Sequence, residues 1–282
     1  MSLRSKDIRR RFDRAAAGFD KFDFVHAVTR DGLLARLAPM LIKASTILDL
    51  GCATGSACKP LAKRFRGARI IGVDQSPEML RQATSKKSLL AKYSFLEASA
   101  DAVPLADQSV DLVFCNQLLP WIDDAPLLFT EVNRLLRKDG LFVFASLGPD
   151  SLSELRHAWQ ASDHGVHISN FPDMHDLGDA AVRAGLSDPV LDVDRLTIRY
   201  ANTAALFRDL TGSAARNCLS KRALSLTGKD RFAAMTDALQ PPGSKAPIEL
   251  QLELVYGHCW GSGPRSRGAE VHIHPGRIGR RS

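Results

Sequence analysis

Short apolar runs alternate with amphipathic segments along the first half of the chain. Each run has the length and composition of a buried strand, and the segments between them carry apolar residues at helical spacing. Strands that alternate with helices form a mostly parallel sheet covered on both faces, with ligands at the carboxyl ends of the strands. The pattern therefore predicts an α/β protein. Its predicted strands are residues 47–50, 68–74, 93–97, 110–115 and 141–147.

Amphipathic periodicity predicts the helices. Before the first strand they cover residues 3–20 and 25–43, the second ending near Pro39. Within the core, residues 56–66 have helical character, and a further helix starts after Ser76, which is followed by proline. Another helix begins at Asp123 or Asp124, and the "RKDG" sequence ends it. Its apolar face is predicted to comprise Leu128, Val132, Leu135 and Leu136.

The pattern changes after Gly148. A helix capped by Asp150 or Ser151, a helix over 172–184 and a strand over 189–200 are predicted. Helical segments interrupted by glycine lie between that strand and a last strand over 248–259, and we interpret them as a lid. The predicted parts are N-terminal helices that cover the active site (1–44), a core (45–200), a helical lid (201–247), the last core strand (248–260) and a basic, loosely ordered tail (261–282).

The sequence from Thr46 to Gly55 joins a strand to a glycine turn and a helix. Gly51 and Gly55 lie where backbone must approach a ligand, and Asp49 precedes them. A bare G-x-x-x-G is more often an ordinary turn than a binding loop. However, Asp74 ends the next strand 19 residues after Gly55, the position from which an acid accepts hydrogen bonds from a ribose. The two features together favour a nucleotide-cofactor site.

The strings "ILDLGCATGS" and "IIGVDQSPEML" resemble the class I S-adenosylmethionine-dependent methyltransferases, and imply a Rossmann-like seven-stranded sheet. In that family the glycine loop holds the methionine part of the cofactor, and the acid after the second strand binds the ribose. Ala53 replaces a glycine, a mild change unless φ is positive. Ser99 replaces an acid that binds adenine, and Asp101 is expected to do part of its work. The residues matched to the cofactor are Asp49, Gly51, Cys52, Gly55, Asp74, Gln75, Met79, Ser99, Ala100, Asp101, Asn116 and Leu118.

Later stretches, among them "GPDSLSEL", "LTGKDR" and "LELVYGHCWG", resemble one branch, the malonyl-acyl-carrier-protein O-methyltransferases (BioC) of biotin synthesis. The resemblance implies methyl transfer to the free malonyl carboxylate, with S-adenosylhomocysteine as product; the methyl ester then primes pimeloyl synthesis. A carboxylate is ionised at pH 7, so no general base is expected. The candidates for lining the substrate pocket are Phe19, which replaces a family tyrosine, Asn116 and Trp121.

Two other functions remain open at this stage. Arginine hydroxylases that assist assembly of respiratory complex I share the fold and parts of the lid. A cofactor-binding assembly protein without catalysis is the third possibility. A labelled-cofactor product assay separates the methyltransferase from both, and modified arginine on a partner peptide separates the hydroxylase from the assembly protein.

The chain carries a formal net charge of +7. No nucleic-acid-binding signature accompanies that charge, and no apolar run is long enough to span a membrane. We therefore expect an acidic protein partner, with Arg9, Arg10 and Arg14 of the basic N-terminal helix docking the carrier protein. Five cysteines without a C-x-x-C pair indicate a reducing cytoplasm, with no disulfide framework and no bound metal. The oligomeric state stays open.

Overall fold

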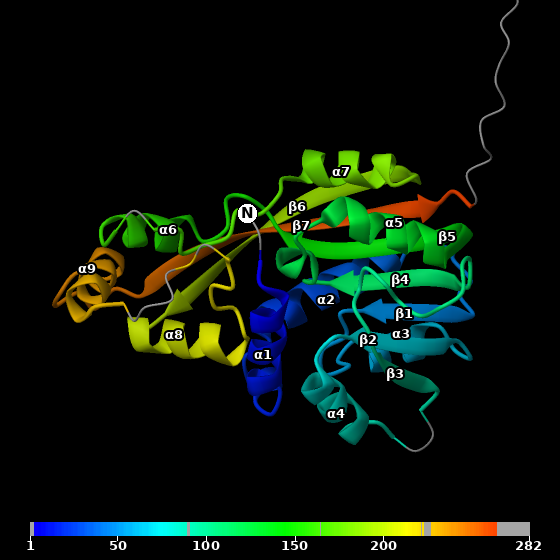
Figure 1. Ribbon diagram of the computed structural model, residues 1–282, viewed down its shortest axis with the longest axis horizontal. Coiled ribbons are helices and arrows are strands. Elements are labelled where there is room, and N and C mark those ends of the chain that lie inside the picture. The colour runs from blue at the N-terminus through cyan, green and yellow to red at the C-terminus, as the bar shows by residue number, and fades with distance from the viewer. Residues whose placement is uncertain (1–2, 89–90, 164, 221, 223–226, 264–282) are drawn as a thin grey trace, which may run out of the picture.

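One seven-stranded sheet forms the centre of the molecule (Figure 1). The computed structural model describes residues 3–88, 91–163, 165–220, 222 and 227–263. The strand order is β3-β2-β1-β4-β5-β7-β6; the first five are parallel, whereas β7 runs antiparallel to both β5 and β6. This arrangement confirms the predicted Rossmann-like sheet. The strands are β1 (Thr46–Leu50), β2 (Arg69–Asp74), β3 (Tyr93–Glu97), β4 (Val110–Asn116), β5 (Leu136–Leu147), β6 (Leu186–Tyr200) and β7 (Ile248–Gly261).

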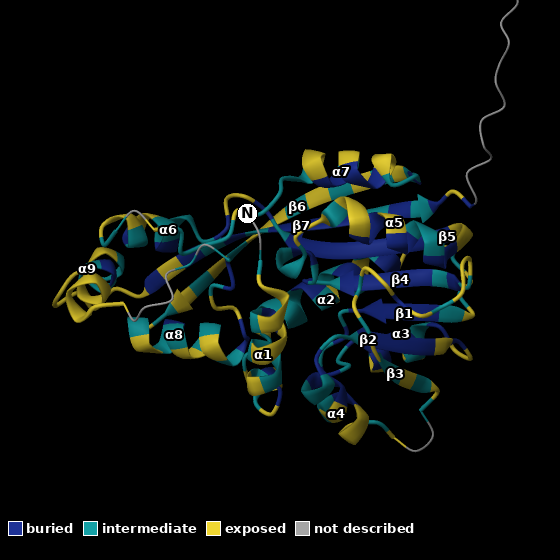
Figure 2. Cartoon of the chain, in the orientation of Figure 1, coloured by how far each residue is buried: buried dark blue, intermediate teal, exposed yellow. Residues whose placement is uncertain are grey.

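Helices cover both faces of this sheet. On one face, α5 (Ala125–Leu135) and α7 (Met174–Arg183) pack against the strands, and on the other face α2 (Phe24–Leu37) and α3 (Cys58–Arg64) do so. Figure 2 shows the inner parallel strands β1, β2 and β4 as mostly buried, whereas the edge strand β3 is partly exposed. Burial on both faces explains why these strands read as continuous apolar runs rather than alternating ones.

Successive residues of β1 show how one short run serves both layers. Leu48 and Leu50 belong to the cluster beneath α5, whereas Ile47 belongs to the cluster beneath α2 and α3. Side chains alternate across a strand, so each strand contributes to both cores. Each fully buried aliphatic side chain stabilises the fold by about 1.5–3 kcal/mol, which fixes the register of the strand that carries the candidate site.

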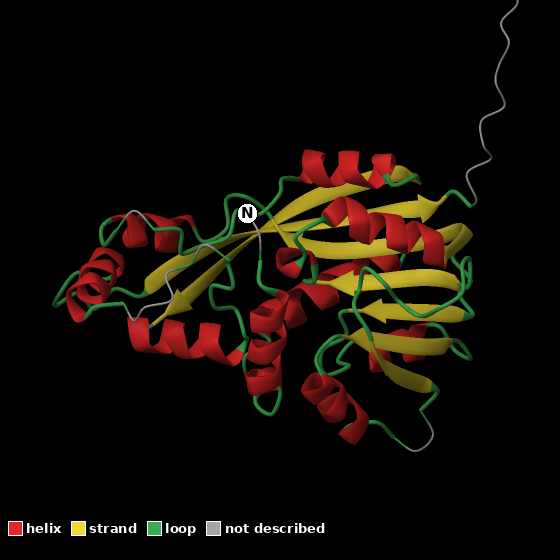
Figure 3. Cartoon of the chain, in the orientation of Figure 1, coloured by secondary structure: helices red, strands yellow, loops and turns green. Residues whose placement is uncertain are grey.

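The strands β6 and β7 extend beyond the rest of the sheet and carry a second group of helices (Figure 3). This group comprises α6 (Ser153–Gln160), α8 (Thr203–Gly212) and α9 (Lys229–Leu239). Leu155, Leu206 and Met235 from these helices pack on Ile248 and Leu250 at the start of β7. The helical insertion thus has its own small core, joined to the sheet through two shared strands.

The N-terminal helix lies between the two parts. Figure 1 shows α1 (Ser5–Ala15) between α8 and α4 (Pro77–Ser85). Arg222 forms an ion pair with Asp7 at 2.5 Å, and the backbone N–H of Arg4 donates to Cys218 O at 3.0 Å. Toward the sheet, Arg9 pairs with Glu97 at 2.9 Å. The first helix therefore connects the helical insertion to the strand edge.

Several predicted boundaries were wrong. The helix expected over 3–20 ends at Ala15 and is followed by a 3₁₀ turn, Phe19–Lys21. The second helix ends at Leu37 rather than continuing to residue 43. Leu136, predicted on the apolar face of a helix, instead begins β5, because its extended backbone pairs with Val110. Tertiary strand pairing overrode the helical periodicity there.

The cap predicted for α6 was also wrong. Neither Asp150 nor Ser151 caps it; the N-cap residue is Leu152, with a left-handed φ of 59°. The hydroxyl of Ser151 instead donates to Glu253 O and accepts from Glu253 N–H, which ties this loop to β7. At the neighbouring helix, Asp124 rather than Asp123 is the cap, accepting from Leu127 N–H at 2.9 Å.

Most of the predicted loosely ordered tail, residues 264–282, lies outside the described part of the chain. Within the described residues, no helix has the length and apolar character needed to cross a membrane. The same residues contain no group of three or more His, Cys, Asp or Glu side chains arranged to hold a metal ion.

Candidate active site

A cavity of about 310 Å³ lies at the carboxyl ends of β1, β2 and β4, beneath α1. This is the edge of the sheet at which the strand order reverses, where α/β proteins bind their ligands. Most of the residues predicted for the cofactor or substrate pocket line it together. They are Phe19, Gly51, Asp74, Gln75, Ser99, Ala100, Asp101, Asn116, Leu118 and Trp121.

The remaining predicted residues lie elsewhere. Asp49 and Cys52 line a smaller adjoining cavity of about 40 Å³, which shares Gly51 with the larger one. Gly55 lines neither cavity: its φ is +74°, and an added Cβ would lie 3.0 Å from the Phe95 ring. Met79 is fully buried against Ala16 and Phe19. Gly55 and Met79 therefore shape the site from behind rather than facing its interior.

Asp74 is held by the backbone on both of its oxygens. The N–H of Ala53 donates to Oδ2 and the N–H of Ser76 donates to Oδ1, each at 2.9 Å. Burial raises the pKa of Asp74, and these two bonds oppose that rise. Each carboxylate oxygen has a second lone pair, so the anchored group retains capacity for two hydroxyl donors.

The glycine loop turns through left-handed conformations at both Gly51 and Ala53, with φ of +75° and +44°. The replacement of glycine by Ala53 is therefore not the mild change expected, because a side chain in this region costs roughly 1–2 kcal/mol. The turn points the Ala53 N–H at Asp74. At Gly51, an added Cβ would lie 3.1 Å from Leu118, so only glycine leaves the cavity wall open.

Two amide side chains that line the cavity each have one buried atom without a hydrogen-bond partner within the described chain. Asn116 donates from Nδ2 to His26 O at 2.9 Å, but its Oδ1 accepts nothing. Gln117 is buried, and its Nε2 donates to nothing. An unsatisfied buried polar group costs about 1–3 kcal/mol, so both fit a ligand that carries donors and acceptors. Gln117 was not predicted as a site residue, and its only signal in the sequence is its place directly after β4.

His26 lies where the cavities meet and was also missed. It lines both cavities described above, and its Nδ1 is buried without a hydrogen-bond partner among the described residues. Burial, together with the smaller effect of the Arg30 charge, lowers the pKa of His26 to about 4. The imidazole is therefore neutral at pH 7, and its ring meets the edge of Phe19 at 5.2 Å between centroids.

Asp49 is buried beneath the glycine loop. Burial raises its pKa to about 7; a bond from the Cys58 thiol at 3.6 Å and the charge of Arg30 oppose the rise, and Asp74 adds to it. Near neutral pH this carboxyl is thus poised between its two forms. A cation bound nearby would favour the ionised form.

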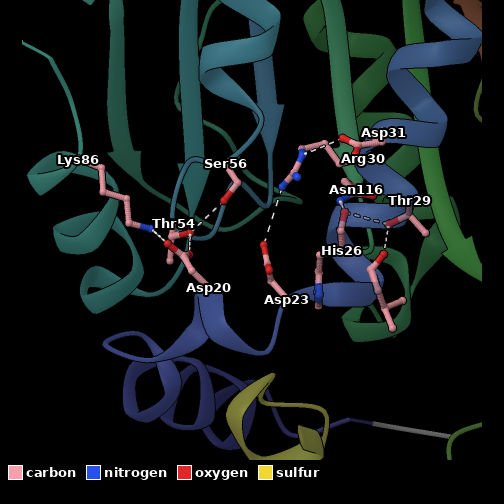
Figure 4. Close-up of polar contacts among 11 residues, drawn as sticks. Asp20, Asp23, His26, Thr29, Arg30, Asp31, Thr54, Ser56, Lys86 and Asn116 are labelled. Carbon is pink, nitrogen blue, oxygen red and sulfur yellow. Dashed lines mark hydrogen bonds and ion pairs between the residues drawn. The ribbon is translucent and has the colours of Figure 1, made fainter. Parts of the chain in front are cut away.

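The N-terminal segment is fastened over the glycine loop by acid groups (Figure 4). Asp20 accepts a hydrogen bond from the Thr54 hydroxyl at 2.6 Å and pairs with Lys86. Burial favours a raised pKa for Asp20, but the bonds from Lys86 and Thr54 outweigh it, so the pKa is lowered. Asp13 accepts from the Ser76 hydroxyl at 2.6 Å. These contacts hold α1 and the following turn across the cavity.

Replacing Asp20 by alanine should loosen this cover. The two bonds are half exposed, so we expect a loss of about 0.5–1.5 kcal/mol, or roughly two- to tenfold in ligand affinity, seen mainly as faster dissociation. Stopped-flow binding of the cofactor measures this. Asp179→Ala is the matched control, because Asp179 is an exposed acid that pairs with Arg183 on α7 and lines neither cavity. Equal dissociation rates in both variants would show that the segment is held by its apolar contacts.

Comparison with known proteins identifies the class. Residues 48–144 match the family model described as a methyltransferase domain. The YcgJ protein of Bacillus subtilis aligns with a TM-score of 0.61 at 17% identity, over 83% of this chain and 100% of that one. A SAM-dependent methyltransferase of Thermotoga maritima aligns with a TM-score of 0.53 at 17% identity, over 90% and 99%. The fold and the site define a class I methyltransferase, with S-adenosylmethionine as the cofactor and S-adenosylhomocysteine as its product.

Full-length relatives narrow the class to a family. A malonyl-[acyl-carrier protein] O-methyltransferase of Gallionella capsiferriformans is 34% identical over 92% of both chains. Proteins of the same name from Legionella pneumophila and Xylella fastidiosa are 34% identical over 99% of both chains, and 37% identical over 90% of this chain and 86% of that one. The chain belongs to the malonyl-[acyl-carrier protein] O-methyltransferase family.

Proposed function

We propose that the protein transfers a methyl group from S-adenosylmethionine to the free carboxylate of a malonyl group on acyl carrier protein, the ester that primes pimeloyl synthesis for biotin. The observation that carries the proposal is similarity to malonyl-[acyl-carrier protein] O-methyltransferases along nearly the whole chain, including the helical insertion. The arginine hydroxylase and the non-catalytic alternatives gain no support from these relatives.

The reaction asks little acid–base chemistry of the protein. The cofactor supplies an electrophilic methyl on a positively charged sulfur. A malonyl carboxylate is already ionised at neutral pH, so the neutral His26 is not needed as a base. The protein's task is alignment of oxygen, carbon and sulfur, worth up to about 7–11 kcal/mol when the geometry is good.

Different residues of the cavity bind different parts of the cofactor. We propose that Asp74 binds the ribose, that Gly51 and Asp49 border the methionine end, and that Ser99 and Asp101, which hydrogen-bond to each other, border the adenine. Apolar rings exclude water from the reacting atoms: Phe12 meets Trp121 edge-on at 5.3 Å between centroids, and Phe19 lies beside Phe12. Phe19 keeps the ring of the family tyrosine without its hydroxyl.

The direct test is a product assay. Malonyl-acyl-carrier protein incubated with the enzyme and S-adenosylmethionine should gain one methyl group on its acyl arm, read by mass spectrometry. A holo carrier without malonyl is the negative control, since it lacks the carboxylate. No gain of mass alongside an active control enzyme would refute the proposal and turn attention to arginine modification on partner peptides.

We further propose that α1 docks the carrier protein through Arg9, Arg10 and Arg14. All three are exposed, and carrier proteins are acidic, so opposite fields would steer the encounter. Arg9 forms an ion pair with Glu97, whereas no described carboxylate forms an ion pair with Arg10 or Arg14. The charge on this surface is therefore only partly neutralised.

Reversing Arg9 and Arg10 to glutamate together should raise KM for malonyl-carrier protein severalfold and flatten its salt dependence. Two arginines are reversed together because each exposed ion pair contributes only about 0–1 kcal/mol. Cofactor affinity and turnover of a small malonyl thioester should stay nearly unchanged, because neither involves the carrier protein. Steady-state kinetics at two salt concentrations measure this. Equal losses on both substrates would instead assign the helix a structural role.

We also propose that the reaction takes place in the cytoplasm. All five cysteines are free and buried, as expected of a protein in a reducing compartment.

A further inference from the structure

A second cleft, of about 500 Å³, lies between α1 and the end of α8. Figure 1 shows these two helices side by side. The cleft is separate from the cofactor cavity and shares no lining residue with it. What distinguishes it is charge. Its charged lining residues are Asp7, Arg10, Arg11, Arg14, Arg216 and Arg222.

The positive charge of this cleft is largely uncompensated. Asp7 is its single acid and pairs with Arg222. No other carboxylate among the described residues forms an ion pair with an arginine of the cleft. Arg11 donates to Asn217 O at 3.0 Å, and Arg216 donates from Nε to the Thr211 hydroxyl at 2.9 Å. Neutral acceptors thus position both guanidinium groups while leaving their charge free.

Arg216 is both partly buried and close to another positive charge. Burial lowers the pKa of Arg216, and the charge of Arg11 lowers it further. Placing several guanidinium groups around one cleft costs free energy unless an anion joins them. Arginine forks match the oxygens of a phosphate, to which they bind bidentately. The buried Nε of Arg222, which has no partner in the described chain, adds a further donor.

The cleft adjoins an apolar cavity. Arg216 and Phe22 line both the cleft and a cavity of about 130 Å³, whose walls include Val25, Ile198 and Leu252. These walls come from α2, β6 and β7, so the cavity lies between the sheet and the helical insertion. It suits an extended, uncharged chain rather than an ionic group.

The apolar cavity in turn meets the cofactor cavity. His26, Gln117 and Trp121 line both. The arginine cleft, the apolar cavity and the cofactor cavity therefore adjoin in that order, and this order defines a route that ends at the unsatisfied amide of Gln117. Along this route the lining changes from cationic to apolar to polar.

We propose that the arginine cleft binds the phosphodiester of the carrier protein's phosphopantetheine arm, and that the apolar cavity guides the arm to the cofactor. The inference rests on the proposed function and adds the route of the substrate. The order of chemistry fits: a phosphate anion, then an uncharged amide chain, then the thioester and malonyl carboxylate. Arg216 marks the entrance, and His26, Gln117 and Trp121 mark the end at which the malonyl group meets the cofactor.

The first experiment uses two small substrates without carrier protein: malonyl-pantetheine, which lacks the phosphate, and malonyl-phosphopantetheine. The wild-type enzyme should favour the phosphorylated compound by about tenfold or more in kcat/KM. The Arg14→Gln/Arg216→Gln variant should lose most of that preference and keep its activity on malonyl-pantetheine. Arg66→Gln/Arg69→Gln is the matched control, because both arginines are exposed near the amino end of β2, at the end of the strand away from the cofactor cavity.

Two results would overturn the route: a wild-type enzyme indifferent to the phosphate, or a double variant that loses activity equally on both compounds. A loss confined to the intact malonyl-carrier protein, with the preference for the phosphorylated small compound unchanged, would also overturn it, because it leaves these arginines with carrier docking alone. Melting temperatures of both variants exclude a folding defect as the cause.

The second experiment reads binding without catalysis. Calorimetry should detect phosphopantetheine binding to the wild-type protein, with affinity about tenfold weaker in Arg14→Gln/Arg216→Gln and weaker still for pantetheine. If malonyl-acyl-carrier protein gains no methyl group while phosphopantetheine binds in this pattern, the proposed reaction fails and the cleft stands. If phosphopantetheine and pantetheine bind alike, the cleft is not a phosphate site, whatever the reaction.

Discussion

Replacing Asp74 by alanine should weaken binding of S-adenosylmethionine by two to four orders of magnitude. The carboxylate offers charge-assisted hydrogen bonds to two ribose hydroxyls, each worth about 1.5–3 kcal/mol. The variant also loses the hydrogen bonds from the N–H groups of Ala53 and Ser76 to Asp74, which in the wild-type protein anchor the glycine loop and the start of α4. Both effects act in the same direction, and calorimetry with the cofactor measures their sum.

The control for this variant is Asp107→Ala. Asp107 is an exposed acid that forms an ion pair with Arg134 and does not line the cavity. Its removal should leave cofactor affinity unchanged. Asp74→Asn is a useful intermediate, because its amide keeps one acceptor but turns an NH₂ group toward one of the two backbone donors. Unaltered affinity in Asp74→Ala would sink the assignment of the ribose site.

Asp74 and Gly51 could be placed from the sequence because their signals are local. An apolar run that ends in an acid, followed by a turn and a helix cap, fixes a strand end. Parallel strands in such a fold bring their carboxyl ends to one edge. Asp74 could be placed in this way from its strand, whereas Asn116 and Leu118 were matched to the cofactor through the family resemblance; all three line one cavity.

Other parts of the site depend on long-range contacts and gave no local signal. Asp20 meets Thr54 and Lys86, which are 34 and 66 residues away in the chain. His26 is brought to the cavities by α2, which resembles any helix that covers a sheet. Likewise Leu136 has the periodicity of a helix, and only pairing with Val110 makes it a strand residue. Sequence patterns predicted the elements, while the tertiary packing decided their edges.

Affinity for S-adenosylmethionine should rise with pH through Asp49. Burial gives this carboxyl a pKa of about 7 in the free protein, whereas the positively charged cofactor favours its ionised form and lowers that pKa. Below pH 7, binding must therefore release a proton. The dissociation constant should fall by up to about tenfold per pH unit as pH rises toward 7, then level off.

The Asp49→Asn variant separates this effect from other titrations. Its affinity should be nearly independent of pH and should match the wild type most closely at about pH 5.5, where Asp49 is protonated in the free protein. Calorimetry in two buffers of different ionisation enthalpy counts the released proton directly. A wild-type affinity as flat as that of the variant, with no proton released, would contradict the assignment of Asp49 to the cofactor site.

Stability of the free protein should change in the opposite direction. Burial holds the pKa of Asp49 at about 7 in the folded protein, above that of an aspartate in the unfolded chain, so its contribution is fully present below about pH 4 and is lost as pH rises through about 7. The melting temperature of the free protein should therefore fall across that window. Bound cofactor should reduce this fall in melting temperature, because its positive charge compensates the buried carboxylate. In Asp49→Asn, the change of melting temperature with pH should be the same with and without cofactor. One ionisable group thus links folding and cofactor binding with opposite signs.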